Sequence, residues 1–290
     1  MVQLMSSRRR ILCPVDFSDL SRHAMVLAAA VARRLGAELT VLHVAPPATA
    51  AGSLSTALHD FVAPAGAAGI MVHTALAEGD PFTCILEQAQ ALPADLIVMG
   101  THGRRGFDRW VLGSVTERVL HRAPCPVMTV NGRAQTPDPS AGPFATVLCA
   151  EDLAGTSATL PYALKLAREG GGRLVVLHAV EEVPETGALG AVPFEFGPLL
   201  VAQARERLHA LIPQAERERG GIDEAVVCGR AYKQILLRAE KEKVDLIVVG
   251  VHSGQPINDL FFGSTTHHVV RGASCPVLTV RGTRAEEIKE

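Results

Sequence analysis

The chain has 290 residues, of which 48% are hydrophobic and 20% are charged, and its formal net charge is −2. This composition is typical of a globular protein, and a net charge near zero provides no overall positive field for nucleic acid or an anionic membrane. No apolar run is long enough to span a membrane, and the segment after Arg8–Arg10 becomes polar too soon for a signal sequence. We therefore expect a cytoplasmic protein with no nucleic-acid or membrane partner.

Short, nearly continuous apolar runs in the first half predict strands that are buried on both faces of a parallel sheet. They cover residues 10–15, 38–44, 70–76, 94–99 and 126–130. Apolar residues that recur every three or four positions predict helices over 18–35, 81–92 and 114–123. Ser18 or Ser21 can cap the first of these helices.

The second half repeats this order of elements. Its predicted strands cover residues 146–150, 173–179, 223–227, 244–249 and 276–280. The offset between the halves rises from 135 at His43 and His178 to 150 at Gly79 and Gly229. The difference, 150 − 135 = 15, is the number of extra residues that follow the second strand of this half. A helix is predicted after them, over 198–219.

Two segments of the chain occur twice. Residues 95–130 match residues 245–280 at a constant offset of 150. Residues 11–16 match residues 147–152 at an offset of 136. A repeat of this length corresponds to a whole domain rather than to one unit of a solenoid. Because strands alternate with helices, we expect two α/β domains, each with a doubly wound, Rossmann-like parallel sheet.

The domain boundaries follow from the place where the repeat stops. Residues 131–143 are polar, rich in proline and without periodicity, which is typical of a linker. We place the first domain at 1–133, the linker at 134–143 and the second domain at 144–290.

Each domain ends in an apolar strand, Pro126–Val130 in the first and Pro276–Val280 in the second. An exposed apolar edge favours aggregation, so such a strand needs a partner. We expect the two strands to pair within the chain and to relate the domains by a pseudo-twofold axis. The sequence does not decide whether the whole chain also forms a homodimer.

The cysteines show no metal-binding or redox spacing, because no C-x-x-C pair occurs among them. Four of the six occupy matching strand positions, which favours thiols that pack in the core. These four are Cys13 with Cys149 and Cys125 with Cys275.

Four histidines also match between the halves. His43 and His178 end the second strand of each half, and His102 and His252 follow the fourth. Neither H-E-x-x-H nor a regular spacing with Cys or Asp supports a metal ion, so we expect no metal site. Hydrogen-bonded histidine and nucleotide-contacting histidine are the two alternatives.

Glycines and small polar residues follow the fourth strand of the first half. Gly100 and Gly103 allow a tight turn that brings backbone N–H groups close to a ligand. Ser114 follows a further glycine at the start of a helix, where unpaired N–H groups attract anions. Asp16 would lie beside them if strands one and four are neighbours. The alternative is a purely structural turn, because Ser114 to Glu117 also has the Ser-x-x-Glu pattern of a capping box.

The spacing G-x2-G-x9-G-[ST], preceded by DLIVMG and followed by APCPVMTV, resembles the universal stress protein family, as does the opening ILCPVDFSDLSRHA. The resemblance covers nearly the whole chain twice. It implies a five-stranded sheet in the order 3-2-1-4-5 in each domain and, as in the nucleotide-binding branch of the family, ATP, with or without Mg²⁺. In the first domain, the resemblance assigns the nucleotide contacts to Pro14, Asp16, Val44, Met99, Gly100, His102, Gly103, Gly113, Ser114, Val115 and Thr116.

The second domain departs from the family pattern in its glycine turn. Ser253 stands where the first domain has Gly103, and the next glycine comes one residue late. We therefore expect weaker or altered nucleotide binding there, although His267 and His268 could offset the loss with positive charge. The residues assigned to this site are Asp152, Ala179, Gly250, His252, Gly254, Gly263, Ser264, Thr265 and Thr266.

The resemblance implies a stress-response regulator that acts by nucleotide-dependent binding to a regulatory protein, whose identity the sequence does not give. We expect no catalytic residues, because the sequence has neither the P-loop motif G-x4-G-K-[ST] nor an ordered Ser/His/Asp or Cys/His set. The alternatives are a slow ATP hydrolase and an interaction scaffold that binds no ligand.

Overall fold

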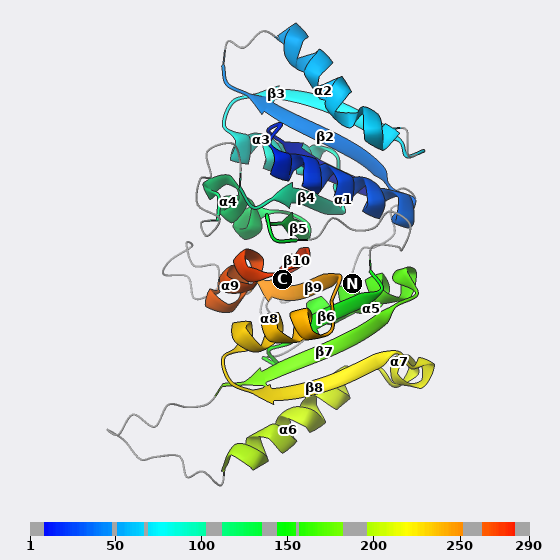
Figure 1. Cartoon of the computed structure of the whole chain (residues 1–290), viewed down its shortest axis with the longest axis vertical. Helices are drawn as coiled ribbons and strands as arrows, with labels where there is room; N and C mark the ends of the chain where they lie inside the picture. Colours follow the sequence, from blue (N-terminus) through cyan, green and yellow to red (C-terminus); the bar gives the residue numbers. More distant parts are fainter. Residues whose placement is uncertain are drawn as a thin grey trace, which may run out of the picture.

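The computed structural model describes residues 9–47, 51–66, 69–102, 112–134, 144–154, 157–181, 196–251 and 263–281. Within them, one ten-stranded sheet runs along the molecule in the order β3-β2-β1-β4-β5-β10-β9-β6-β7-β8 (Figure 1). Neighbouring strands are parallel throughout each half, and only β5 and β10, where the halves meet, pair in antiparallel fashion. The expected order 3-2-1-4-5 is confirmed in the first half, and the second half mirrors it.

The first half contains strands β1 (Arg10–Val15), β2 (Glu38–Ala45), β3 (Val72–Glu78), β4 (Leu96–Gly100) and β5 (Val127–Val130). Its helices are α1 (Asp19–Leu35), α2 (Ala51–Gly66), α3 (Pro81–Ala91) and α4 (Ser114–Arg122). The second half contains strands β6 (Thr146–Ala150), β7 (Arg173–Val180), β8 (Ile222–Cys228), β9 (Leu246–Val251) and β10 (Val277–Arg281). Its helices are α5 (Thr159–Gly170), α6 (Phe196–Leu211), α7 (Gln214–Arg219), α8 (Ala231–Lys241) and α9 (Ser264–Gly272). The predicted strands are confirmed, with ends that differ by at most two residues.

Helix α2 is not predicted by the sequence pattern. Its residues are rich in glycine, serine and alanine and include Pro64, so the helical periodicity is weak. Leu58, Phe61 and Val62, which are spaced by three and four positions, are nevertheless buried. Packing of this one face against the sheet therefore stabilises a helix that intrinsic propensity does not predict.

The single helix predicted over 198–219 is wrong, because the structure has two helices, α6 and α7, in this region. Pro213 immediately precedes α7 and has extended backbone angles of φ −56° and ψ 137°. Proline has no N–H to donate to the preceding turn, so it ends one helix and allows the next to begin.

The matching cysteines pack in the core as predicted. Cys13, Cys149 and Cys275 are buried, and Cys125 is half-buried. Burial raises the pKa of the Cys13, Cys125 and Cys275 thiols to about 12. These thiols therefore stay protonated at neutral pH and are poor nucleophiles.

The seam between the halves is formed by β5 and β10, as the two apolar edge strands predict. Met128 lies opposite Leu278, and the two residues occupy matching positions of the repeat. Thr129 and Thr279 also match, and each donates its hydroxyl to a carbonyl oxygen of the opposite strand, at 3.3 and 2.9 Å. The pseudo-twofold axis therefore passes between Met128 and Leu278.

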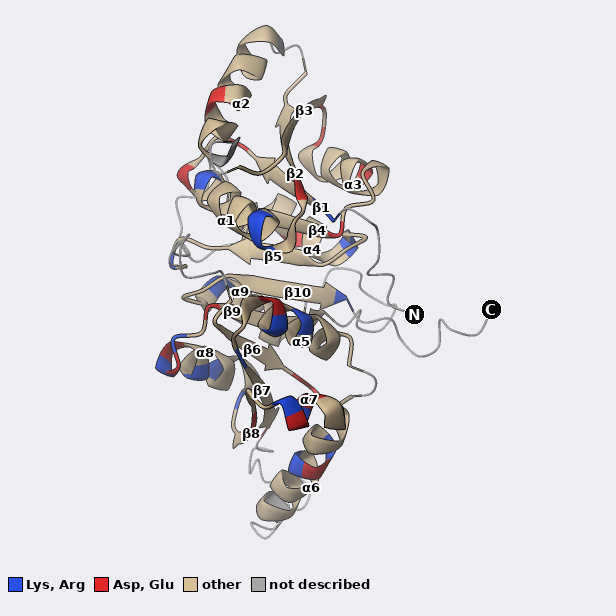
Figure 2. Cartoon of the chain, turned by 90° about the vertical axis from the view of Figure 1, so that its right-hand side faces the viewer, with Lys and Arg blue, Asp and Glu red and all other residues tan. Residues whose placement is uncertain are grey.

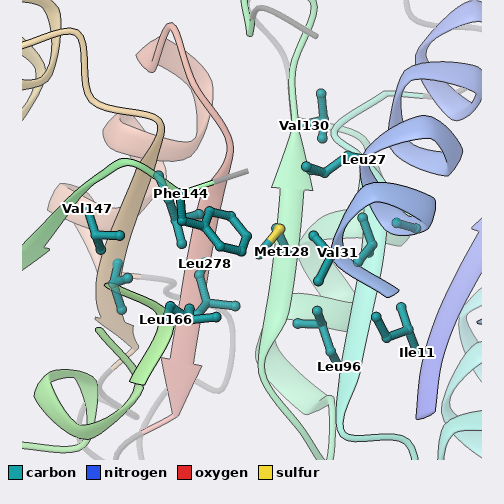
Figure 3. Packing of buried hydrophobic residues seen from close by; sticks show 14 of the residues in the cluster. Ile11, Leu27, Val31, Leu96, Met128, Val130, Phe144, Val147, Leu166 and Leu278 are labelled. Carbon is teal, nitrogen blue, oxygen red and sulfur yellow. The ribbon is translucent and has the colours of Figure 1, made fainter. Parts of the chain in front are cut away.

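The hydrophobic core continues across this seam. Leu27 and Met128 from the first half pack in the same cluster as Phe144 and Leu278 from the second, and each is at most 2% exposed (Figure 3). Charged residues of both signs lie on the helices, whereas β5 and β10 carry almost none (Figure 2). In the part of the chain that the structure describes, no helix has the length and apolar character needed to cross a membrane.

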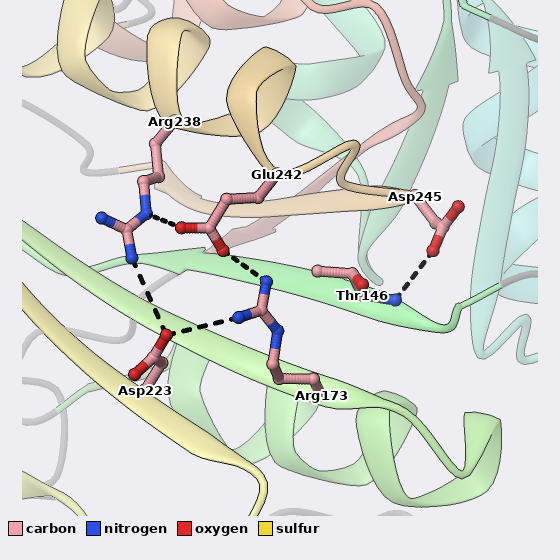
Figure 4. Close-up of polar contacts among 6 residues, drawn as sticks. All are labelled: Thr146, Arg173, Asp223, Arg238, Glu242 and Asp245. Carbon is pink, nitrogen blue, oxygen red and sulfur yellow. Dashed lines mark hydrogen bonds and ion pairs between the residues drawn. The ribbon is translucent and has the colours of Figure 1, made fainter.

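The aspartate of the repeated DLIV segment fastens each fourth strand to the first strand of its half. The Asp245 carboxylate accepts the Thr146 N–H at 2.7 Å, and the Asp245 N–H donates to the Thr146 carbonyl at 2.9 Å (Figure 4). Asp95 makes the same two bonds with Arg10, at 2.8 and 2.9 Å. These bonds align the strands whose far ends form the crevices described below.

Replacement of Asp245 by alanine should lower the free energy of unfolding by about 2 kcal/mol, because the Thr146 N–H loses a charged acceptor. Asp223→Ala is a control from the same region (Figure 4). Asp223 pairs with Arg173 at 3.4 Å, but its side chain is 52% exposed, so its loss should cost at most about 1 kcal/mol. Urea unfolding followed by circular dichroism measures both values, and equal losses would contradict the role given to Asp245.

Candidate functional site

The carboxyl ends of β1 and β4 lie side by side, because these strands pair in parallel from Ile11 opposite Leu96. The chain passes from β1 to β2 on one side, and β4 lies on the other side of β1, so the switch point of the sheet lies between β1 and β4 (Figure 2). Ligands of doubly wound sheets bind outside such strand ends. We use the name first crevice for the sheet edge that carries Asp16, Val44, Gly100 to His102 and Gly113 to Thr116. The second crevice is its counterpart, formed by Asp152, Ala179, Gly250 and Gly263 to Thr266.

Asp16 holds the loop that leads from β1 into α1. Its Oδ1 accepts the Ser18 N–H at 3.1 Å and the Ser21 hydroxyl at 2.5 Å. Ser18 caps α1, since its hydroxyl oxygen accepts the Ser21 N–H at 3.2 Å. Of the two predicted caps, Ser18 is therefore the correct one, and Ser21 instead fixes the Asp16 carboxylate at the mouth of the crevice.

The residue after Asp16 has an unusual backbone conformation that the sequence does not reveal. Phe17 has φ 65°, and Leu153, at the matching position of the second half, has φ 58°. Positive φ is rare for residues with large side chains, and it is maintained only where the surrounding structure requires it. The turn places the Phe17 ring 4.3 Å from the His43 ring and 5.5 Å from the Phe61 ring, between centroids.

His43 and its counterpart His178 connect the second strand of each half to the first. The Nδ1 atom of each lies 2.8 Å from a main-chain carbonyl oxygen, that of Val15 or Glu151. A carbonyl oxygen only accepts, so Nδ1 carries the hydrogen in both residues. Hydrogen bonding is thus the observed role of this pair. Across the described ranges, no group of three His, Cys, Asp or Glu side chains is arranged to hold a metal ion.

Two glycines bring the start of α4 against the end of β4. A Cβ atom on Gly100 would lie 2.9 Å from Cγ of Leu20, in α1. A Cβ atom on Gly113 would lie 3.0 Å from the Thr101 carbonyl oxygen, to which the Gly113 N–H donates at 2.8 Å. Both approaches are closer than ordinary side-chain contacts, so a side chain at either position would force the neighbouring atoms to shift.

Helix α4 begins at Ser114, with Gly113 as its N-cap. The predicted capping box is wrong, because Ser114 is the first helical residue and no side chain accepts a hydrogen bond at the cap. The N–H groups of Ser114, Val115 and Thr116 are in the first turn and have no intrahelical acceptor. Together with the helix dipole, they give this corner of the first crevice a partial positive charge that suits a phosphate group.

The threonines of the first turns anchor α4 and α9 to the sheet. The Thr116 hydroxyl donates to the Gly100 carbonyl at 2.9 Å, and the Thr266 hydroxyl donates to the Gly250 carbonyl at 2.9 Å. Both threonines are buried. Their hydroxyl hydrogens are therefore used within the protein, and the group that Thr116 offers to a ligand is its backbone N–H.

His102 follows β4 and carries a buried nitrogen without a partner. Its Nδ1 lies 2.9 Å from Oγ1 of Thr101, and its Nε2 is buried with no hydrogen-bond partner in the described part of the chain. Burial, and then the positive charge of Arg271 in α9, lower the pKa of His102. The imidazole is therefore neutral at neutral pH, and a ligand or water molecule would satisfy the buried Nε2.

The other residues assigned to the first crevice are less accessible. Pro14 and Met99 are buried within their strands, and Val44 is half-buried at the end of β2. Gly103 lies outside the described residues, as do His252 and Gly254 of the second half.

The second crevice differs from the first at the end of its first strand. Glu151 is buried, and its carboxylate accepts the hydroxyls of Ser157, at 2.7 Å, and Thr159. In the first half, the serine that matches Ser157 bonds to Asp16 instead. Asp152, the counterpart of Asp16, is exposed and accepts the N–H two residues further on at 2.9 Å. The nucleoside end of this crevice therefore has a different hydrogen-bond arrangement.

The phosphate end of the second crevice is less tightly packed. Helix α9 begins at Ser264 with Gly263 as an N-cap that has no side-chain hydrogen bond, as in α4. Among the described residues, a Cβ atom on Gly263 would meet no atom within 4 Å. Within this part of the chain, Gly263 therefore lacks the close contact that Gly113 makes.

The positive charge expected from His267 is weakened by its surroundings. Burial, and then the charge of Arg271, lower the pKa of His267. His268 stacks on Tyr232, with ring centroids 4.3 Å apart, and its Nδ1 lies 2.6 Å from the Ser264 carbonyl oxygen. The His268 ring is therefore engaged within the second half.

The described fold is that of a tandem, doubly wound α/β protein with a switch point in each half. The model of the Universal stress protein family matches this chain twice, over residues 7–131 and 144–281. The chain therefore belongs to the universal stress protein family and carries two copies of its domain.

Curated relatives and a solved structure agree with this assignment. Universal stress protein MJ0531 of Methanocaldococcus jannaschii is 36% identical over 138 residues, which cover 42% of this chain and 81% of that protein. A universal stress protein of Mycolicibacterium smegmatis is 26% identical over 216 residues, covering 73% of this chain and 70% of that protein. The crystal structure of a universal stress protein from Archaeoglobus fulgidus has a similar fold, with a TM-score of 0.65, 23% identity and coverage of 94% of this chain and 98% of that one.

The different packing at the two N-caps leads to a test within one chain. Gly113→Ala should cost about 1 kcal/mol more stability than Gly263→Ala, because only the first Cβ would press against a carbonyl oxygen. The loss of a glycine N-cap is common to both variants and cancels in the comparison. Thermal or urea unfolding measures the difference, and equal stability of the two variants would contradict the close contact at Gly113.

Proposed function

We propose that the chain binds an adenine nucleotide, ATP, in the first crevice and acts as a stress-response regulator through nucleotide-dependent binding to another protein. The observation that carries this proposal is the first turn of α4, which has no side-chain cap and is packed by Gly113 against the end of β4 at the switch point. Membership of the universal stress protein family supports the choice of an adenine nucleotide, which the nucleotide-binding pattern of that family implies.

The triphosphate would lie in front of α4. The N–H groups of Ser114, Val115 and Thr116 supply hydrogen-bond donors, and the helix dipole favours negative charge. Because the N-cap is glycine, no side chain occupies the position where a cap would compete with the ligand. His102 supplies the buried Nε2, which lacks a partner in the described structure and would bond to a phosphate or ribose oxygen.

The nucleoside would lie toward the ends of β1 and β2. The Asp16 carboxylate is held in place by Ser18 and Ser21, so it is oriented before a ligand arrives. A carboxylate in this position suits ribose hydroxyls or the adenine amino group, both of which donate hydrogen bonds. Val44, half-buried at the end of β2, provides an apolar surface for the base.

Any Mg²⁺ would come with the nucleotide and be held mainly by phosphate oxygens and water, which is the usual way in which this ion is bound. Oδ1 of Asp16 already accepts two hydrogen bonds from its own loop. Efficient catalysis is not part of this proposal, because phosphoryl transfer needs a metal-binding acid and a group that positions water. In the described crevice, the candidates for these roles are Asp16, engaged by its loop, and the neutral His102. Slow ATP hydrolysis is the second candidate activity.

The second crevice should bind the same nucleotide more weakly or act as a scaffold without ligand. The serine of its first loop bonds to the buried Glu151, and a Cβ atom on Gly263 would meet no atom of the described residues within 4 Å. The sequence adds Ser253 at the position of Gly103. These three differences affect both the nucleoside end and the phosphate end.

Gly113→Asp should remove ATP binding to the first crevice. A carboxylate at the N-cap would itself accept the first-turn N–H groups and would repel the triphosphate. Isothermal titration calorimetry on the full chain measures the effect.

Gly263→Asp is the matched control and should leave the tighter site unchanged. Gly113→Ala, which adds bulk without charge, should retain measurable affinity and so separates repulsion from misfolding. Unchanged ATP affinity in a folded Gly113→Asp variant would contradict the proposed site.

A further inference from the structure

Asn131, the first residue after β5, connects the two domains at one buried point. Asn131 is buried, with 5% of its surface exposed. Nδ2 donates across the seam to the carbonyl oxygens of Val270, at 3.0 Å, and Ala273, at 2.9 Å. Oδ1 accepts the N–H groups of Arg133, at 2.8 Å, and Ala134, at 3.1 Å, within its own half. The amide is thus shared between a contact with the second domain and a turn of the first.

The acceptors in the second domain belong to the end of α9. The last carbonyl groups of a helix have no intrahelical donors, and the helix dipole makes this end partially negative. The amide of Asn131 donates to three of these carbonyls, those of Val270 and Ala273 and, at 3.4 Å, that of Arg271. The same nine-residue helix forms the phosphate end of the second crevice at its first turn.

On its other side, Asn131 adjoins the wall of the first crevice. The Thr101 N–H donates to the carbonyl oxygen of Val130, the residue before Asn131, at 2.8 Å. His102 follows Thr101, and burial, and then the charge of Arg271 in α9, lower the pKa of His102. Hydrogen bonds therefore run from the last turn of α9 through Asn131 and the end of β5 to the residues beside His102.

The second half has no equivalent of the Asn131 side chain. The position that matches Asn131 in the second half is Arg281, which is exposed at the end of β10. Arginine has a long, charged side chain and cannot reproduce the compact amide that both donates and accepts. The pseudo-twofold symmetry of the seam therefore breaks at this position.

We propose that Asn131 is a positioning residue for the first crevice. By fastening the last turn of α9 beside the end of β4, it makes the ligand affinity of the first domain depend on the second domain. This inference rests on the proposed binding of ATP in the first crevice. It gives the second domain a role as the support of the first, whether or not the second crevice holds a ligand.

Asn131→Asp removes the contact with little change of shape. Aspartate keeps the oxygen that accepts from Arg133 and Ala134, but it has no amide hydrogens to donate to α9. Its charge also opposes the negative end of that helix. Asn131→Ala removes the amide without adding a negative charge. If both variants lose the same affinity, loss of the amide is responsible.

Thr279→Val is the matched control at the same seam. It removes a buried bond of 2.9 Å from a side chain to a main-chain carbonyl, that of Val127, which lies four residues before Asn131. Valine and threonine have nearly the same shape. This variant therefore weakens the seam without touching the route from α9 to Thr101.

Calorimetric ATP titrations of the full chain compare the variants. Both Asn131 variants should bind ATP in the first crevice about fivefold or more weakly than the unmodified chain, while Thr279→Val should bind it normally. Unchanged affinity in the Asn131 variants overturns the proposal. An equal loss in Thr279→Val also overturns it, because the effect would then follow seam stability alone.

A second readout needs no nucleotide. Amide hydrogen exchange followed by NMR should be faster at Thr101 and His102 in Asn131→Asp than in Thr279→Val. If the unmodified chain fails to bind ATP, the proposed function is wrong, and the exchange rates still decide whether Asn131 positions the end of β4. Equal exchange in the two variants would overturn the positioning role.

Discussion

The antiparallel pairing of β5 with β10 is the constraint on which the rest of the molecule depends. It joins two five-stranded sheets into one, places Met128 opposite Leu278 on the pseudo-twofold axis, and extends the core on one face across both halves. It also brings α9 beside the end of β5, so that Asn131 and Arg271 reach the neighbourhood of the first crevice. The apolar edge strands β5 and β10 would favour aggregation if exposed, and here they form the contact through which one domain supports the other.

Much of this architecture can be predicted from the sequence because several signals agree. Continuous apolar runs mark the strands, and the repeat at offset 150 identifies two domains and their final strands. Helix α2 escapes prediction because its burial depends on the neighbouring sheet rather than on propensity. The residues on both sides of Pro213 have a helical pattern, so the pattern alone predicts one helix where α6 and α7 are separate. The proline is the sequence signal for the break between them.

The candidate site is predictable in its location but not in its hydrogen bonds. Glycine spacing and the order of strands place it at the switch point, and the predicted helix start at Ser114 is confirmed, whereas the Ser-x-x-Glu pattern predicts a side-chain cap that α4 does not have. The positive φ of Phe17, the buried carboxylate of Glu151 and the bridge made by Asn131 have no local sequence signature. Comparison of the two halves is a signal for Glu151 and Asn131, which differ from their counterparts, but not for Phe17, because Leu153 shares its positive φ.

The most direct test of nucleotide binding at α4 is to follow the backbone amide signals of the two matching helix starts by NMR during an ATP titration. We predict that the amide hydrogens of Ser114, Val115 and Thr116 shift first, because they form the uncapped turn at the tightly packed crevice. The matching signals of Ser264 to Thr266 should shift only at higher ATP concentration. Shifts confined to α9, or to residues outside both crevices, would contradict the account.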